Sequence, residues 1–284
     1  YLEVGGRGRR TMGPVSLAAS AGVRRQDLFT GRDHTGLDLA RGRLGAKLDL
    51  GSGNELVLET SAIATNGDMH TKLGEMTVHQ LTNHVGRVRL ALGDLTAQFV
   101  YDHYGMDVDT NIFFAQADLI LARMPTFVGD HHKVTGNILH TLEVFHNRVT
   151  YGGEYIYNLY DFGINIPDTQ AEHRFGLFVQ DEVDLGKLLV DVADLDPSYL
   201  MLTLGLRCDY NTLSGWELSP RAAVVWAPVR QHAFRAGYAR AFLKPTFFET
   251  RMHVRLDDPN GFGFDEFRMR AEGVDNEILD AVEL

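Results

Sequence analysis

The chain has 284 residues, of which 44% are hydrophobic and 23% are charged, and its formal net charge is -11. This length fits one large β-domain or two small ones. No apolar run approaches the roughly 18 residues of a spanning helix, so a membrane protein of this sequence would cross with strands. The negative charge argues against nucleic acid as a partner, because phosphate binding needs a basic surface. A single cysteine, Cys208, excludes an intrachain disulfide framework and a zinc-type cluster.

The first predicted strands lie between residues 13 and 64. Positions 15–23 place valine, leucine and alanine on odd numbers and small or polar residues on even numbers, which is the period of a strand with one apolar face. A polar loop at 26–36 leads to a second strand at 43–50. Gly51-Ser52-Gly53-Asn54 then turns that strand directly into a third at 55–64. A short turn therefore follows a long loop.

This alternation of connections continues to residue 159. We expect a loop at about 65–82, followed by two strands around a Gly93-Asp94 turn. A long loop, 103–132, comes next, in which 111–123 fits either a short helix or a further strand pair. Residues 133–144 and 149–159 then form another predicted hairpin.

The most regular strand pattern lies between Leu200 and Phe248. Three consecutive strands each carry apolar side chains on one face and an arginine on the other. The turn at 228–231, between the second and third of these strands, is tight. Residues 184–198, before the first strand, are interpreted as an insertion, and residues from 244 to about 276 show little strand pattern.

These strands also carry a family resemblance. GLFVQDEVDL, LTLGLRCDYN and SPRAAVVWAPVRQHAFRAGYARAFLKPTFFE occur in this order. Together they resemble the barrel signature of TonB-dependent outer-membrane receptors, which commonly show a Q-D-E strand, a G-L-R-x-D strand, an S-P-R element and an F-x-x-P-T element. The resemblance covers about a quarter of the chain. Leu243-Lys244 departs from the family pattern, where an Arg-Ala pair is more usual, and so does the insertion at 184–198.

The predicted fold is all-β: part of an antiparallel, up-and-down transmembrane β-barrel wall with short periplasmic turns and long extracellular loops. About twelve or thirteen strands are expected, with aromatic residues near strand ends and charges on the face opposite the apolar one. A soluble β-sandwich has the same two-residue period, so alternation alone does not separate the two folds. The absence of interleaved helices excludes a parallel sheet.

We interpret residues 1–284 as a partial receptor barrel that lacks the plug domain and the C-terminal strands. The basic cluster Arg7, Arg9 and Arg10 is followed by no signal-peptide core, and the strand pattern stops at Leu284 without the terminal aromatic residue usual in outer-membrane barrels. Barrels of this class have about 22 strands around a plugged lumen. The chain would therefore supply about half of a wall.

The resemblance implies a receptor of the bacterial outer membrane. It would take up a scarce small-molecule ligand, such as a ferric siderophore, haem, cobalamin or a glycan, with energy from the TonB complex. That complex would act through the missing plug region, and outer-membrane lipid would surround the wall. A passive porin-like or adhesin-like barrel is the alternative from another class, and a soluble ligand-binding β-sandwich is a third.

The sequence predicts a polar wall but no binding residue. Charged residues recur on the polar faces of the strands, and we expect them to face the lumen of a barrel, mostly in structural ion pairs; outward-facing charges on a soluble sheet are the alternative. The predicted lumen-facing residues are Arg43, Lys47, Arg87, Arg89, Glu154, Arg207, Arg221 and Arg235.

No catalytic, cofactor or metal site is predicted. Asp130-His131-His132, like the group His70, His79 and His84, is interpreted as a set of solvated loop residues, because adjacent residues of an extended backbone do not readily converge on one ion. Asp181 and Glu182 are strand neighbours that point to opposite faces, so they do not form an acid/base pair. No nucleophile motif, phosphate-binding loop or dinucleotide fingerprint occurs. We therefore expect no enzyme activity.

Overall fold

The chain forms one large antiparallel sheet. The computed structural model describes residues 2–26, 37–71, 74–116, 119–123, 127–163, 169–193, 199–229, 231–245, 250, 252–255, 266–269 and 275–284. The main sheet path runs through β1 (Leu2–Met12), β2 (Val15–Gln26), β3 (Leu37–Gly51), β4 (Asn54–Thr71), β5 (Gly74–Leu92), β6 (Leu95–Gln116), β8 (Phe127–Val144), β9 (Asn147–Phe162), β10 (Thr169–Asp184), β11 (Leu200–Asn211), β12 (Gly215–Val229), β13 (His232–Leu243) and β16 (Glu277–Glu283).

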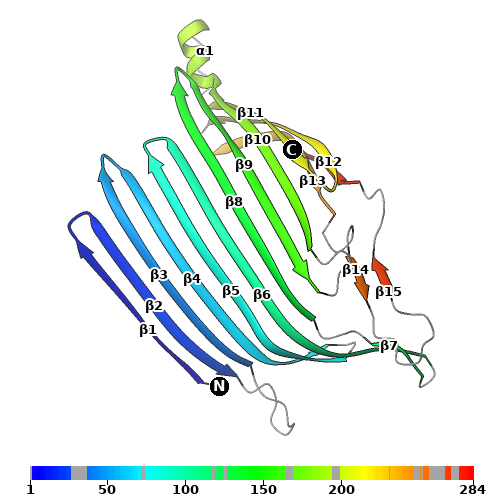
Figure 1. Cartoon of the computed structure of the whole chain (residues 1–284). Coiled ribbons are helices and arrows are strands. Elements are labelled where there is room, and N and C mark those ends of the chain that lie inside the picture. The colour runs from blue at the N-terminus through cyan, green and yellow to red at the C-terminus, as the bar shows by residue number, and fades with distance from the viewer. Residues whose placement is uncertain are drawn as a thin grey trace.

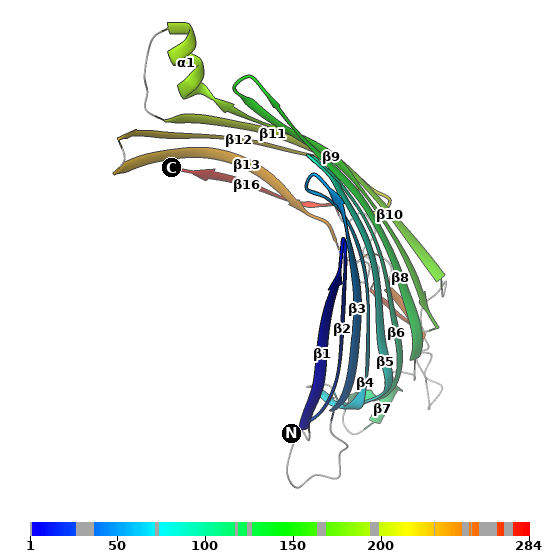
Figure 2. The same cartoon turned by 90° about the vertical axis from the view of Figure 1, so that its left-hand side faces the viewer.

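Neighbouring strands on this path are antiparallel, and their order in the sheet is their order in the chain. Three small strands, β7, β14 and β15, lie off the path. β7 (Leu119–Arg123) pairs with β6, and β14 (Met252–Arg255) pairs with β15 (Glu266–Met269) in a separate two-stranded sheet. The sheet curves into a wall that is open between β1 and β16 (Figures 1 and 2). This is the predicted up-and-down barrel wall, and a soluble β-sandwich is wrong because the strands form a single curved layer.

The wall has two different rims. At one rim, which we call the short-turn rim, two-residue turns join β1 to β2, β3 to β4, β5 to β6, and β8 to β9. Ser52 and Gly53 have φ values of 54° and 80°, and a type I′ hairpin turn requires positive φ at both central residues. The opposite edge, the loop rim, carries the connections β2–β3, β6–β8, β9–β10 and β13–β16 (Figure 1).

Residues 184–198, predicted as an insertion, contain the helix α1 (Leu185–Ala193) at the short-turn rim (Figure 1). The backbone N–H of Lys187 donates to Asp184 Oδ1 at 3.0 Å, so Asp184 caps the first turn. His146 Nε2 lies 3.0 Å from Asp191 Oδ2, which ties the helix to the β8–β9 turn. Within the described residues, no helix is long and apolar enough to span a membrane.

The strands extend further toward the loop rim than predicted. The expected loop at 65–82 is mostly strand, because β4 continues to Thr71 and β5 begins at Gly74. The expected loop at 103–132 contains the outer halves of β6 and β8, together with β7, so the strand-pair reading of 111–123 is correct and the helix reading is wrong. Ladder hydrogen bonds sustain these extensions. The added segments show no regular apolar alternation from which a strand could be predicted, because several are polar on both faces and residues 111–123 are apolar without a two-residue period.

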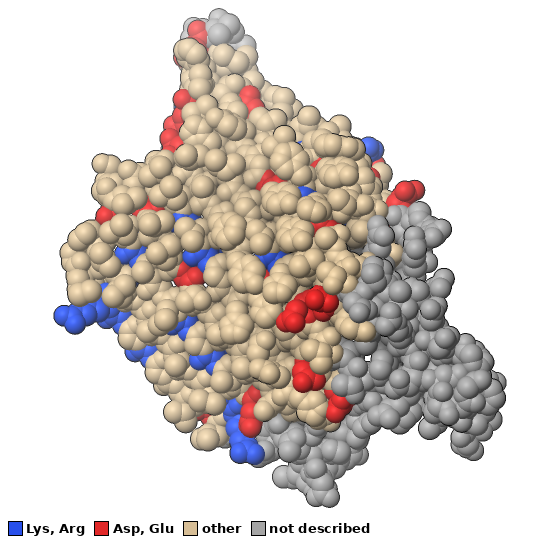
Figure 3. Space-filling model, viewed as in Figure 1, with Lys and Arg blue, Asp and Glu red and all other residues tan. Residues whose placement is uncertain are grey.

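The two faces of the wall differ in chemistry. The convex face, seen in Figure 3, shows few charges over the middle of β1–β10. Large apolar side chains lie exposed there: Leu44, Leu177 and Leu204 are 59%, 52% and 46% exposed. An uncovered apolar face of this extent needs an apolar environment around it.

Aromatic residues bound this apolar face. On β12, Trp216 lies against Tyr210 with ring centroids 4.9 Å apart, and Trp226 lies against Phe234 at 5.8 Å, both pairs with tilted rings. Both tryptophans lie on the convex face, ten residues apart (226 minus 216), with only apolar side chains at the convex positions between them. At about 3.3 Å per residue this is about 33 Å along the strand. A strand tilt of about 40° reduces it to a band about 25 Å tall, the height of a membrane-spanning barrel.

Candidate functional site: the concave face

Charged side chains on the concave face of β3–β5 form two neighbouring groups of ion pairs, which we call the charged lattice. Glu59 on β4 accepts an ion pair from Arg43 on β3 and a second, at 3.3 Å, from Arg87 on β5. Glu55, four residues earlier, pairs in the same way with Lys47 on β3 and, at 3.9 Å, with Arg89 on β5. The antiparallel register places these residues on one face, since side chains two residues apart along a strand share a face. Each carboxylate therefore bridges two cations.

Cations outnumber carboxylates on this part of the wall. The concave face of β1–β5 carries eight cationic and four acidic side chains among those described, a surplus of four positive charges in a chain whose net charge is -11. Arg41 on β3 pairs with Glu3 on β1 at 3.0 Å, in an ion pair separate from the charged lattice. The face attracts anions. The cations are Arg7, Arg9, Arg24, Arg41, Arg43, Lys47, Arg87 and Arg89, and the carboxylates are Glu3, Asp49, Glu55 and Glu59.

A second polar group lies on β9–β11. Arg207 donates Nε to Asp209 Oδ2 at 2.8 Å and Nη2 to Asp209 Oδ1 at 2.7 Å, and its Nη2 also reaches Glu154 Oε1 at 3.4 Å. This bidentate geometry fixes the guanidinium plane against the wall. The guanidinium group of Arg207 is therefore engaged in contacts within the sheet, and we do not expect it to bind a ligand.

Two arginine side chains on this face pack over glycines of the neighbouring strand, Arg221 with its aliphatic stem and Arg207 with its guanidinium group. A Cβ added at Gly205 would come within 2.7 Å of Arg221 Cγ, and a Cβ at Gly176 would come within 2.6 Å of Arg207 Nη2. Glycine at these strand positions leaves the space in which the long side chains lie flat. The arginines predicted as site residues on β11 and β12 thus depend on glycines in the strands beside them.

All eight residues predicted from sequence lie on the concave face by register. The structure brings four of them, Arg43, Lys47, Arg87 and Arg89, into the lattice around Glu55 and Glu59, and it joins Glu154 to Arg207. Arg221 and Arg235 lie apart from both groups. Arg235 pairs with Glu283 on β16 at 3.5 Å.

Sequence reasoning missed the most buried polar group of the wall, Glu172 on β10, which is 1% exposed. Its Oε1 accepts from Asn211 Nδ2 at 2.8 Å and from Lys244 Nζ, and its Oε2 accepts from Asn158 Nδ2 at 3.0 Å. Tyr160 OH adds a longer contact of 3.5 Å. One carboxylate therefore joins β9, β10, β11 and the chain just after β13. The available signal was Lys244, which departs from the family pattern.

The segment that follows β13 is also held where it returns to the sheet. Asn276, which is 9% exposed and directly precedes β16, donates Nδ2 to Glu217 Oε1 on β12 at 2.9 Å. Lys244 at the exit and Asn276 at the return thus both attach to strands across the wall. These two contacts place both ends of the excursion 244–276 against the concave face.

The histidines differ from their predicted setting. His79, His84, His131 and His132 lie in strands rather than in loops. His84, His103 and His132 stack across β5, β6 and β8 on the convex face, with ring centroids 6.0 and 4.6 Å apart. Parallel rings do not direct their nitrogens at one point, and no group of three or more metal-ligating side chains is found in the described part of the chain. His70 lies in β4, and its side chain is outside the described residues.

Asp181 and Glu182 lie on opposite faces, as predicted. Glu182 is on the concave face, where Gln180 Nε2 donates to its Oε1 at 2.8 Å. Asp181 is on the convex face near the short-turn rim and accepts from Asn147 Nδ2 at 3.2 Å. The two carboxyl groups therefore do not face one another across a common reaction centre.

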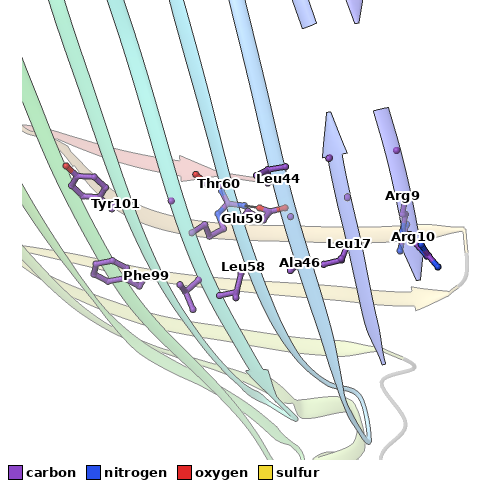
Figure 4. Close-up of a pocket in the computed structure, with 17 residues that line it drawn as sticks. Arg9, Arg10, Leu17, Leu44, Ala46, Leu58, Glu59, Thr60, Phe99 and Tyr101 are labelled. Carbon is purple, nitrogen blue, oxygen red and sulfur yellow. Dashed lines mark hydrogen bonds and ion pairs between the residues drawn. The ribbon is translucent and has the colours of Figure 1, made fainter. Parts of the chain in front are cut away.

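A groove of about 900 Å³ crosses β1–β6 on the convex side. Figure 4 shows Leu17, Ala46, Leu58 and Phe99 in a row across β2, β3, β4 and β6, with Arg10 at the β1 end. Most of the lining of the groove belongs to the apolar convex face, but Glu59 and Arg87, which pair with each other in the charged lattice, also border it.

Comparison with known proteins identifies relatives of this wall. The family described as "TonB dependent receptor-like, beta-barrel" matches residues 4–267. No curated protein sequence matches the chain. Among solved structures, the siderophore receptor PirA from Pseudomonas aeruginosa superposes with a TM-score of 0.63 at 15% identity, over 97% of this chain and 46% of that one.

Two further structures show the same fold. The FrpB iron transporter from Neisseria meningitidis has a TM-score of 0.62 at 12% identity, covering 86% of this chain and 45% of its own. The Serratia marcescens hemophore receptor HasR, in complex with its hemophore HasA and heme, has a TM-score of 0.65 at 15% identity, covering 88% and 44%. The chain thus spans less than half the length of each of these three structures.

Proposed function

Because the chain belongs to the family of TonB-dependent receptor β-barrels, we propose that it forms part of the wall of an outer-membrane receptor that takes up a scarce ligand with energy from the TonB complex. One observation carries the proposal. A single curved sheet has an apolar convex face bounded by aromatic residues and a charged concave face. A wall of this kind stands between lipid and an aqueous lumen.

The two rims support a proposal for the orientation of the wall in the membrane. Outer-membrane barrels have short turns on the periplasmic side and longer loops on the extracellular side. The short-turn rim with α1 then lies in the periplasm, and the excursion 244–276 lies outside the cell. The plug domain, the remaining strands and the motif that contacts the TonB complex lie outside residues 1–284 in this proposal.

The charge of the wall supports a proposal for the ligand class. The concave face of β1–β5 has the surplus of cations described above, which favours an anionic ligand or an acidic face of a plug. The similar structures include a siderophore receptor, an iron transporter and a hemophore receptor with heme. We propose an anionic iron chelate or haem as the ligand. The predicted lumen residues would contribute to the electrostatic potential of the lumen and would not bind metal directly.

The test is energy-dependent uptake by cells that carry the complete gene. We would compare the uptake of radiolabelled iron, supplied as haem or as individual ferric siderophores, between a deletion strain, the complemented strain and a complemented strain without the TonB complex. The proposal expects uptake of at least one chelate that needs both the gene and the TonB complex. Passage that needs the gene but not the complex would identify a passive porin and contradict the proposal.

A further inference from the structure

Histidines bound the apolar band of the convex face on β8. His132 lies on the side of the loop rim and His140 on the side of the short-turn rim, and the three convex positions between them carry valine, glycine and isoleucine. These eight residues (140 minus 132) span about 26 Å along the strand. A tilt of about 40° reduces this to a band about 20 Å tall. The two histidines therefore hold the places that the two tryptophans hold on β12.

The neighbouring strands repeat this arrangement on the side of the loop rim. The register aligns His84 on β5 with His103 on β6, and His103 with His132 on β8. On β10, His173 comes directly before the apolar convex positions 175, 177 and 179. We call these four residues the outer histidines. All four strands lie inside the sheet, with a paired strand on each side, so the row does not depend on a sheet edge.

Histidines are the basic groups of this part of the convex face. Among the described residues of β5, β6, β8, β9 and β10, no lysine or arginine lies on that face. The carboxylates nearest the outer histidines lie farther toward the loop rim. Asp130 takes His103 Nε2 at 2.8 Å, and Asp109 takes His79 Nε2 at 2.6 Å. Asp107 and Asp161 share the face at that rim.

Two of the outer histidines are held by a tyrosine through one ring nitrogen. Tyr101 OH lies 2.8 Å from His132 Nδ1, and Tyr155 OH lies 2.8 Å from His173 Nδ1. A tyrosine that donates to Nδ1 leaves the proton of a neutral imidazole on Nε2. Within the described residues, Nε2 of these two histidines makes no hydrogen bond. Each ring therefore offers an N–H donor at the outer edge of the apolar band.

We propose that His132 and His173 bind phosphate groups of the anionic glycolipid in the outer leaflet. Lipid phosphates lie just beyond the acyl chains, at the level where the apolar band ends, and their oxygens accept hydrogen bonds. Protonation of the imidazoles adds a charge attraction. His103 is engaged by Asp130 and supports the row by stacking on His132 with ring centroids 4.6 Å apart.

This inference rests on the orientation given under the proposed function. It is independent of the transported ligand and of the TonB complex. Lipid binding is measured without transport, so a negative result there would leave the proposed uptake standing, and a negative uptake result would leave the lipid site standing.

The test titrates fluorescently labelled lipid A against the complete protein, purified from outer membranes in mild detergent. Titrations are run at about pH 5.5 and about pH 8, between which imidazole changes its charge. The double variant His132→Phe with His173→Phe keeps both rings and removes their nitrogens. At the lower pH it should bind lipid A about fivefold more weakly for each histidine replaced, since a basic residue near an anionic lipid surface contributes about that factor. Acidification should strengthen binding in the parent more than in the double variant.

His140→Phe is the matched control. His140 Nδ1 pairs with Tyr151 OH at 2.8 Å in the same way, but at the other edge of the band. This variant should bind lipid A as the parent does. Phenylalanine suits a lipid-facing position, so all three substitutions should fold. Dephosphorylated lipid A should bind equally to the parent and the double variant.

Equal binding of phosphorylated lipid A by the parent and the double variant would overturn the proposal. So would a loss in His140→Phe as large as the loss in the double variant, because the contact would then not be confined to the outer edge. A loss of dephosphorylated lipid A in the double variant as large as the loss of lipid A would also overturn it, because the rings would then contact acyl chains or sugars and not phosphate.

Discussion

At the scale of single residues, the contact between Lys244 and Glu172 is the most consequential on the concave face. Glu172 is 1% exposed, and Lys244 is its only cationic ion-pair partner among the described residues. Removing one partner of a buried pair leaves an uncompensated charge, which costs about 3–5 kcal/mol. Lys244→Met should therefore lower the free energy of unfolding of the complete protein in lipid vesicles by about that amount, measured by urea titration of tryptophan fluorescence.

The double variant Glu172→Gln with Lys244→Met supplies the control. Neither a charge nor an ion pair remains in it, and Asn158 and Asn211 can still hydrogen-bond the new amide. It should be less destabilised than Lys244→Met alone. A Lys244→Met variant as stable as the parent would show that the carboxyl group of Glu172 is neutral or is paired elsewhere.

A neighbouring pair on β11 tests which face meets lipid. Leu204 lies on the convex face and Thr203 on the concave face. Arginine at Leu204 would enter the apolar band and cost about 2–4 kcal/mol near the midplane, whereas arginine at Thr203 would join the polar wall. Leu204→Arg should therefore block assembly in the outer membrane, seen as loss of the heat-modifiable folded band, and Thr203→Arg should assemble. Equal assembly of the two variants would contradict the assignment of faces.

Residue roles were predictable only where they follow from alternation along a strand. The two-residue period predicts the face of the sheet on which Arg43, Arg87 and Arg207 lie. Their partners do not, because Glu59 and Asp209 become neighbours through register and side-chain direction. Lys244 and Glu172 are 72 positions apart, and they meet only because the sheet curves. That curvature leaves no local trace in the sequence.

At the scale of elements, the strands were predictable within the apolar band and unpredictable beyond it. The outer parts of β4, β5, β6 and β8 have polar residues on both faces, so the apolar signal ends while the ladder continues. The histidines were assigned to loops for this reason. Bulges such as those at Thr65/Gly67 and Val78/Gln80 also shift the alternation by one residue.

Glycines within β10 and β11 set the packing of the neighbouring strands. Gly205→Ala places a Cβ 2.7 Å from Arg221 Cγ, so the arginine stem has to move. Overpacking of this kind costs about 1–3 kcal/mol. The unfolding midpoint in urea should fall for Gly205→Ala. Gly45→Ala is the control on the same face, because its nearest neighbours lie at 3.9 Å, and it should leave the midpoint unchanged or raise it. If the unfolding midpoint shifted equally in Gly205→Ala and Gly45→Ala, the change would come from the strand propensity of alanine and not from contact with Arg221.

At the scale of the whole molecule, the chain is a curved wall whose stability depends on its surroundings. Among the residues that the structure describes, few hydrophobic side chains are buried, and the large apolar residues of the convex face are exposed. The family and the up-and-down architecture could be predicted from the strand motifs between residues 176 and 249. The curvature, the charge surplus on β1–β5 and the groove beside Arg10 could not, because each depends on the register of several strands at once.

The central claim is that the convex face meets lipid and the concave face meets water. The most direct measurement is thiol labelling of the complete protein in outer membranes, in a Cys208→Ser background, with single cysteines along β11 and β12. A water-soluble maleimide should label cysteines at Thr203 and Ser219, on the concave face, and leave those at Leu204 and Leu218, on the convex face, unlabelled. Equal labelling at all four positions would contradict the account, because both faces would then be in water.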